Sequence, residues 1–395
     1  MKNYWLCKVL LFGFALGLLL IPSRAETIQQ GENLVIGKSF TLSSKILGEE
    51  RPIWVYLPEG YGKSRDSYPV FYLLDGDMHF HHVSGIIEIL SKYSHMPRMI
   101  LIAIPNIDRE RDFLPTRENN WPPVAAADKF RGFLKKELLP LIDKKYRTRP
   151  FRILCGHSHG GTFCMQTFLE DPDLFTAYIA VSPGLYWDNE LLLKQGQKVL
   201  KNATFKNNFL YLTTSADDEG GIAPTMDFYV LLESNSLPGL RWHFEYMPKD
   251  DHLSVAHPTV YNALLWLHQG WRLSESTLEH MTLNEVKDHY KKLSQRYGSA
   301  VPVPEGVLLN LGYSIQGHGR IPEAIETFQY GIQLYPGSPY CYEGLGEVYE
   351  ESGSLELARK NYETALKLAE KNNDAMILPT VRILLEQVLK KIKDK

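Results

Sequence analysis

The chain has 395 residues, and 44% of them are hydrophobic, which is sufficient for two domains with ordinary hydrophobic cores. Its 43 Lys and Arg residues and 46 Asp and Glu residues give a formal net charge of −3. This balance lacks the excess of positive charge with which proteins bind phosphate backbones, so a nucleic-acid partner is not expected.

The first 25 residues have the pattern of a secretory signal peptide. Lys2 and Lys8 precede the apolar run 9–21, and small residues follow at Ser23 and Ala25. Cleavage after Ala25 would remove three positive charges and no acid, moving the formal charge from −3 to about −6. An uncleaved anchor is the alternative, but so short a run spans a bilayer poorly. We therefore expect a periplasmic or secreted protein without stable membrane insertion after cleavage.

Apolar strand patterns alternate with helical patterns from about residue 40 to 267. The predicted strands are 53–57, 70–74, 99–104, 151–155, 178–181, 209–213 and 242–246, and the predicted helices are 83–93, 126–142, 162–169 and 259–267. Continuous apolar strands separated by helices indicate an α/β fold with a mostly parallel sheet covered on both faces. In such sheets, ligands bind at the carboxyl ends of the strands.

The segment Gly156-His157-Ser158-His159-Gly160 lies between the predicted strand 151–155 and the predicted helix 162–169. A strand, a sharp turn and a helix in this order expose a serine hydroxyl as a nucleophile at the edge of a sheet. Glycine is needed beside the serine because side chains there would collide with the neighbouring strand and helix. Ser158 is therefore the predicted nucleophile.

A nucleophilic serine requires a base and an acid that orients the base, and in this architecture they follow in the order serine, acid, histidine. His252 lies on the loop after the predicted strand 242–246, where a base is expected. Three carboxylates follow the strand 209–213, namely Asp217, Asp218 and Glu219. Spacing alone does not choose among them, and Asp218 is the preferred acid.

Acyl transfer also requires N–H donors for the oxyanion of the tetrahedral intermediate. One expected donor is the main-chain N–H of His159, the residue after the nucleophile. The strand 70–74 ends in a glycine turn, so the second donor is expected at Gly76 or Asp77.

Three nearby histidines, His79, His81 and His82, could suggest a metal site. No carboxylate or cysteine accompanies them at the spacing that metal ligands show, so neither a metal nor another cofactor is predicted. A face of the first helix or the rim of the substrate cleft is the simpler explanation.

The chain beyond Arg272 has only helical patterns, and these contain a repeat. Gly312, Gly319, Ala324 and Phe328 recur as Gly346, Gly353, Ala358 and Tyr362, each 34 residues later. This period is typical of tetratricopeptide repeats, in which small residues mark the crossing of two helices. We expect a catalytic domain at 26–272, a helical linker at 273–300 and helical repeats at 301–395. Two repeats rarely stand alone, so they should pack against the catalytic domain, a second subunit or a protein partner.

Residues 35–270 resemble an esterase family of the alpha/beta hydrolases that includes the siderophore (enterobactin-type) esterases and esterase D. The resemblance rests on Val55-Tyr56-Leu57-Pro58 with Tyr61, Tyr68-Pro69-Val70, Leu74-Asp75-Gly76, Asn106 through Phe113, the Gly-His-Ser-His-Gly-Gly segment, Ser182-Pro183 with Trp187, and His252-Leu253-Ser254-Val255. It implies an alpha/beta hydrolase with a Ser-acid-His triad, without a metal and with an oxyanion donor just after Gly76. It also favours Asp218 as the acid. Family members with a helical tail are similar to this chain in its C-terminal third as well.

The resemblance further implies that Arg109 and Arg111 lie on a loop beside the active site, where an arginine contacts an anionic ligand in siderophore esterases. Trp187 follows a strand end, and it either lines the acyl pocket or packs in the core. The expected protein is an exported serine esterase acting on a small-molecule ester. Acyl transfer by the same triad, or a scaffold whose helical repeats are the binding part, are the alternatives.

Overall fold

The structure is a computed structural model, and it describes residues 33–218 and 220–394. The predicted signal peptide and the acid candidate Glu219 lie outside the described residues. Ile36–Lys395 forms one compact unit. The division into a catalytic domain, a linker and repeats therefore stays a prediction.

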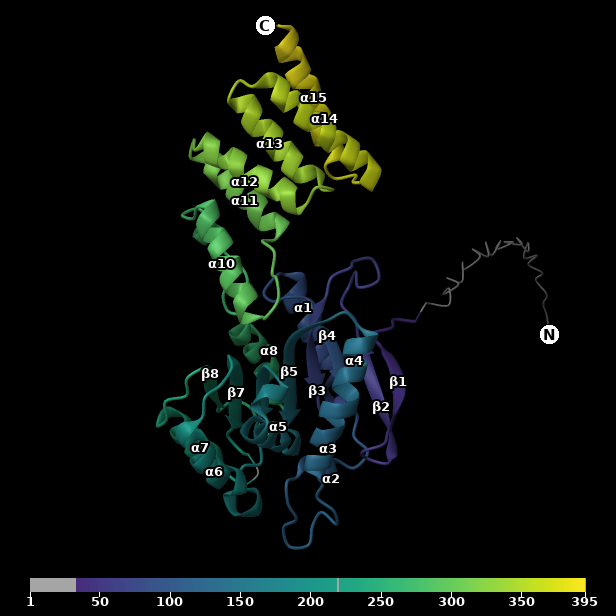
Figure 1. Ribbon diagram of the computed structural model, residues 1–395, viewed down its shortest axis with the longest axis vertical. Helices are drawn as coiled ribbons and strands as arrows, with labels where there is room; N and C mark the ends of the chain where they lie inside the picture. Colours follow the sequence, from purple (N-terminus) through teal and green to yellow (C-terminus); the bar gives the residue numbers. More distant parts are fainter. Residues whose placement is uncertain (1–32, 219, 395) are drawn as a thin grey trace, which may run out of the picture. The chain divides into compact units, whose positions relative to one another are not determined.

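The described residues form an eight-stranded sheet in the order β1-β2-β4-β3-β5-β6-β7-β8, shown in Figure 1. The strands are β1 Lys38–Ser44, β2 Glu49–Tyr56, β3 Tyr68–Leu73, β4 Ile100–Ala103, β5 Thr148–His157, β6 Ala177–Val181, β7 Asn208–Ser215 and β8 Leu240–Met247. The pairs β1–β2 and β2–β4 are antiparallel, and the other neighbours are parallel. The predicted α/β fold with a mostly parallel sheet is confirmed. The edge strand β1 was missed because most of its side chains are exposed or half-buried, which leaves no apolar run in the sequence.

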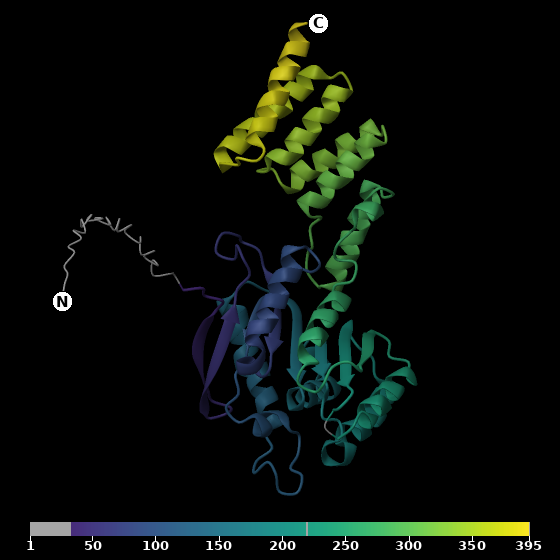
Figure 2. The same cartoon turned by 180° about the vertical axis from the view of Figure 1, so that it is seen from behind.

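Helices cover both faces of this sheet, as Figures 1 and 2 show from opposite sides. One face carries α1 (Gly76–Lys92) and α8 (Ala256–Leu267), and the other carries α3 (Ala127–Phe133), α4 (Leu139–Lys145), α5 (His159–Glu170), α6 (Trp187–Val199) and α7 (Ala223–Glu233). All six residues of β3 are buried, and alternate side chains enter the two cores: Phe71 joins the α1 side and Tyr72 the α3 side. This double burial explains the continuous apolar strand patterns.

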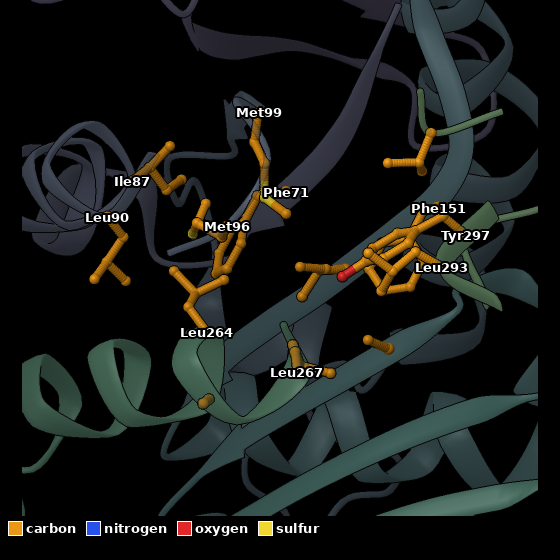
Figure 3. Packing of buried hydrophobic residues seen from close by; sticks show 14 of the residues in the cluster. Phe71, Ile87, Leu90, Met96, Met99, Phe151, Leu264, Leu267, Leu293 and Tyr297 are labelled. Carbon is orange, nitrogen blue, oxygen red and sulfur yellow. The ribbon is translucent and has the colours of Figure 1, made fainter. Parts of the chain in front are cut away.

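The core on the α1 side continues into the first helices of the C-terminal part. Phe71, Ile87 and Leu264 lie in this core, and Phe151 contacts Tyr297 beyond the end of α10 (Leu283–Arg296), with ring centroids 4.7 Å apart (Figure 3). The tail is thus anchored on the sheet by apolar packing.

The remaining helices of the C-terminal part are α9 Glu275–Leu278, α11 Glu305–Gly317, α12 Ile321–Leu334, α13 Pro339–Glu351, α14 Leu355–Asn372 and α15 Leu378–Lys393. A methyl group added at Gly312 would meet the Phe328 ring at 2.6 Å, and one at Gly346 would meet the Tyr362 ring at 2.5 Å. The pairs α11–α12 and α13–α14 therefore pack through the same contact between a glycine and an aromatic ring, as the 34-residue period predicts. Among the described residues, none of the helices has the length and apolar character needed to cross a membrane.

Candidate active site

Ser158 occupies the sharp turn between β5 and α5, with φ 58° and ψ −122°. Its N–H donates to Val181 O at 2.9 Å, and its carbonyl accepts from Thr162 N at 2.9 Å. A positive φ is costly for a non-glycine residue and persists only where the surroundings impose it. These bonds to β6 and α5 impose the conformation, which projects the serine from the carboxyl end of β5.

The glycines of this turn have no room for side chains. A methyl group at Gly156 would lie 2.2 Å from Gly160 O, and one at Gly160 would lie 2.8 Å from Asp75 Oδ2. Side chains at these two positions would therefore collide with neighbouring atoms, as the sequence predicts.

Gly156→Ala is accordingly expected to lower the free energy of unfolding by about 1–3 kcal/mol, because overpacking forces the backbone apart. Gly85→Ala is the matched control, since Gly85 lies on an exposed part of α1 and a methyl group there meets nothing within 4 Å. Denaturant unfolding of both variants checks this expectation. Equal stability of the two variants would contradict it.

Asp218 and His252 lie together at the carboxyl ends of β7 and β8. The His252 Nδ1–H donates to Asp218 Oδ1 at 3.0 Å. The carboxylate, 6% exposed, also accepts from Thr214 Oγ1, Ser215 Oγ and Ser215 N. Burial would raise the pKa of Asp218, but the hydrogen bonds from His252, Ser215, Thr214 and Ser182 outweigh it and lower the pKa to about 2. Asp218 thus presents a permanent negative charge to the imidazole.

Asp217 has a different partner in the same loop. Its Oδ1 accepts the main-chain N–H of His252 at 2.9 Å. Of the two described carboxylates, Asp218 bonds the imidazole and Asp217 bonds the backbone that carries it.

His157 joins the loop of His252 to the strand that carries Ser158. Its Nε2 lies 2.7 Å from His252 O, and the two ring centroids are 4.8 Å apart. Burial, with the neighbouring His252 and His79, lowers the pKa of His157 to about 4, so its ring is neutral at neutral pH. Since a carbonyl only accepts, the single proton of this ring lies on Nε2. The bond brings His252 to the edge of the sheet where Ser158 lies.

The helix N-termini beside Ser158 supply N–H groups. His159 and Asp77 lie in the first turns of α5 and α1. The N–H of Gly76, however, donates to Ile104 O at 3.0 Å. The prediction of Gly76 as an alternative oxyanion donor is therefore corrected, because its proton is used in the fold, and Asp77 remains.

The arginines expected to bind substrate are held in ion pairs. Arg109 donates to the fully buried Asp75 at 2.6 Å and to His157 O at 2.9 Å, so it ties the β3–α1 turn to β5. Arg111 bonds Glu49 at 2.7 Å and Asp112 at 2.8 Å. These ion pairs give both arginines a structural role, and each guanidinium keeps N–H groups beyond those that the carboxylates bind. The substrate-binding role expected for Arg109 and Arg111 therefore stays a prediction.

Trp187 lies beside the residue that follows Ser158. Its side chain is 8% exposed, its Nε1–H donates to Thr116 O at 3.2 Å, and its ring centroid lies 5.9 Å from that of His159. Trp121, which sequence reasoning missed, lies 5.7 Å from Trp187 and 6.3 Å from His159. The sequence could have indicated this residue, because Asn119-Asn120 favours a turn and Trp121 follows it directly.

Two histidines of α1, His79 and His82, pack next to His157. His79 Nδ1 and His82 Nε2 share a hydrogen bond of 3.0 Å, and the His79 ring lies 5.4 Å from that of His157. Burial lowers the pKa of both, to about 4 for His82. Within the described part of the chain, no three His, Cys, Asp or Glu side chains converge as a metal site would require. The pair packs instead as neutral rings.

Comparison with known proteins identifies the region around this site. The family described as "Putative esterase" matches residues 44–215. The matched region belongs to this esterase family. The "Ferri-bacillibactin esterase BesA" of Bacillus subtilis is 29% identical over 225 residues, which cover 50% of this chain and 78% of that protein.

Two solved structures are similar over more of the chain. An "IroE-like serine hydrolase" from Shewanella oneidensis has a TM-score of 0.65 and 28% identity, covering 76% of this chain and 99% of that one. An uncharacterised protein from Capnocytophaga ochracea has a TM-score of 0.69 at 16% identity and covers 90% of this chain and 99% of that one, so the fold extends into the helical tail. The chain is thus an esterase of the α/β-hydrolase type, a carboxylic ester hydrolase.

Proposed function

We propose that this protein is an exported serine esterase that acts through an acyl-enzyme on Ser158. The observation that carries the proposal is the His252–Asp218 hydrogen bond at the sheet edge that also holds the strained Ser158 turn. A base oriented by a buried carboxylate beside a projecting serine is the arrangement that makes a hydroxyl nucleophilic.

In the proposed reaction, the Ser158 Oγ attacks the ester carbonyl while His252 Nε2 takes the hydroxyl proton. Asp218 holds the proton of Nδ1 and stabilises the imidazolium that forms. The N–H groups of His159 and Asp77 donate to the oxyanion. The carbon–oxygen bond of the ester then breaks, and the leaving alcohol takes the proton from His252. Water adds to the acyl-enzyme by the same steps and releases the acid.

The substrate is proposed to be a small-molecule ester of the siderophore type, because the bacillibactin relative is named for that activity. Export is proposed from the pattern of residues 1–25. An amino terminus at Glu26 in protein recovered from the periplasm or medium would support export. An intact leader there would contradict it.

Labelling with a fluorophosphonate tests the proposed nucleophile. We expect one equivalent of label per chain, located by mass spectrometry on Ser158, because only an activated serine attacks the phosphorus at a useful rate. Heat-denatured protein is the control and should remain unlabelled. Label on another serine, or none on the folded protein, would contradict the proposal.

A further inference from the structure

The loop before α3 contains a tight turn that holds Trp121. Glu118 and Trp121 exchange two main-chain hydrogen bonds of 2.8 Å, and Asn119 and Asn120 between them have φ values of 49° and 64°. Two central residues with positive φ make the tight turn of a hairpin, which asparagine tolerates. The Arg117 guanidinium donates to Asn120 O and Pro122 O at 3.1 Å each. Trp121 thus stands on a loop that is fixed by its own hydrogen bonds.

This turn carries the indole to the edge of the proposed oxyanion site. The rings of Trp121, Trp187 and His159 lie 5.7–6.3 Å from one another, within the range of favourable aromatic pairs. Trp187 and His159 pack against the Trp121 ring, yet 45% of Trp121 remains exposed. His159 supplies the N–H next to the nucleophile, so the open indole borders the space in which an ester would react.

A half-exposed indole contributes less to the core than a buried one, and its fixed position leaves an apolar aromatic surface open to solvent. An aromatic ring placed on it would gain both buried area and ring–ring contact without ordering a loop. We propose that Trp121, Trp187 and His159 form a subsite that binds a planar aromatic ring in the ester, and that Trp121 determines this specificity. The inference rests on the proposed esterase function.

Matched esters with a phenyl or a cyclohexyl ring test the subsite, because the two rings are similar in size and differ in planarity and π electrons. Ethyl 3-phenylpropanoate and ethyl 3-cyclohexylpropanoate place the ring in the acyl part. Benzyl acetate and cyclohexylmethyl acetate place it in the alcohol part. The measured quantity is the ratio of kcat/KM for phenyl over cyclohexyl within each pair.

Trp121→Ala is expected to lower this ratio about three- to tenfold in the arm whose ring reaches the subsite, mainly through KM. Trp121→Phe should keep most of the ratio. Val124→Ala, a change at an exposed apolar residue of the same loop, should leave it unchanged. An equal fall for phenyl and cyclohexyl esters in both arms would overturn the subsite.

The esterase proposal fails separately from this one. If the wild-type protein hydrolyses the esters and reacts with fluorophosphonate, but the ratio does not respond to Trp121, only the subsite is wrong. If Ser158 takes no label and no ester is hydrolysed, the proposed function and the subsite fall together. Should Trp121→Ala unfold the chain, Trp121→Leu in the same assay decides, because leucine fills the space without a ring.

Discussion

Ser158→Ala is expected to lower kcat/KM for a small aryl ester by about four to six orders of magnitude. The change removes the only atom that can form the acyl-enzyme in the proposed reaction, while oxyanion donors and binding groups leave a residual rate. Steady-state hydrolysis of a nitrophenyl acetate measures this loss. A value within tenfold of the wild-type rate would show that another group carries the chemistry.

The fold of this variant should remain intact, which separates loss of chemistry from loss of structure. The hydrogen bonds that hold the turn are made by the main chain of residue 158, to Val181 O and from Thr162 N. Alanine keeps both and has the same backbone preference as serine at this φ. The melting temperature and circular dichroism spectrum are therefore expected to match those of the wild-type protein.

Strands buried on both faces could be predicted from the sequence. Every residue of β3 is buried because helices cover both faces of the sheet, and this burial gives a run of consecutive apolar and aromatic residues in the sequence. The sequence also predicts that Ser158, Asp218 and His252 lie at one edge of the sheet, because the carboxyl ends of parallel strands share that edge. β1 was missed because its exposed residues carry no such pattern.

The partners of charged residues could not be predicted in the same way. Arg111 bonds Glu49, 62 positions away, and this contact depends on how the β1–β2 hairpin meets the helix α2 (Arg109–Phe113). Arg109 likewise bonds Asp75, which lies 34 positions earlier in the chain. A local pattern shows that an arginine is near the site, but only the packing shows which carboxylates it binds.

The roles of the two neighbouring carboxylates give the second large expected effect. Asp218→Asn should lower kcat by about 10³- to 10⁴-fold, because an amide lacks the charge that stabilises the imidazolium and can favour the wrong tautomer of His252. Asp217→Asn keeps the oxygen that accepts the His252 N–H, so a loss below about tenfold is expected. Glu219→Gln completes the series. If the largest loss of kcat occurred at Glu219 or Asp217, that residue and not Asp218 would be the acid of the triad.

The pH dependence of the wild-type enzyme gives an independent measure of the same carboxylate. The pKa of Asp218 is lowered from 3.8 to about 2, so its negative charge persists as the pH falls through the range in which an ordinary aspartate protonates. Its support of the imidazole is therefore complete above about pH 4 and is lost only toward pH 2. A fall of kcat/KM between pH 8 and pH 5 would then come from a group other than Asp218. A second carboxylate-like step near pH 4 in that profile would show that the acid of the triad has an ordinary pKa, and would exclude the hydrogen-bonded Asp218 from the role.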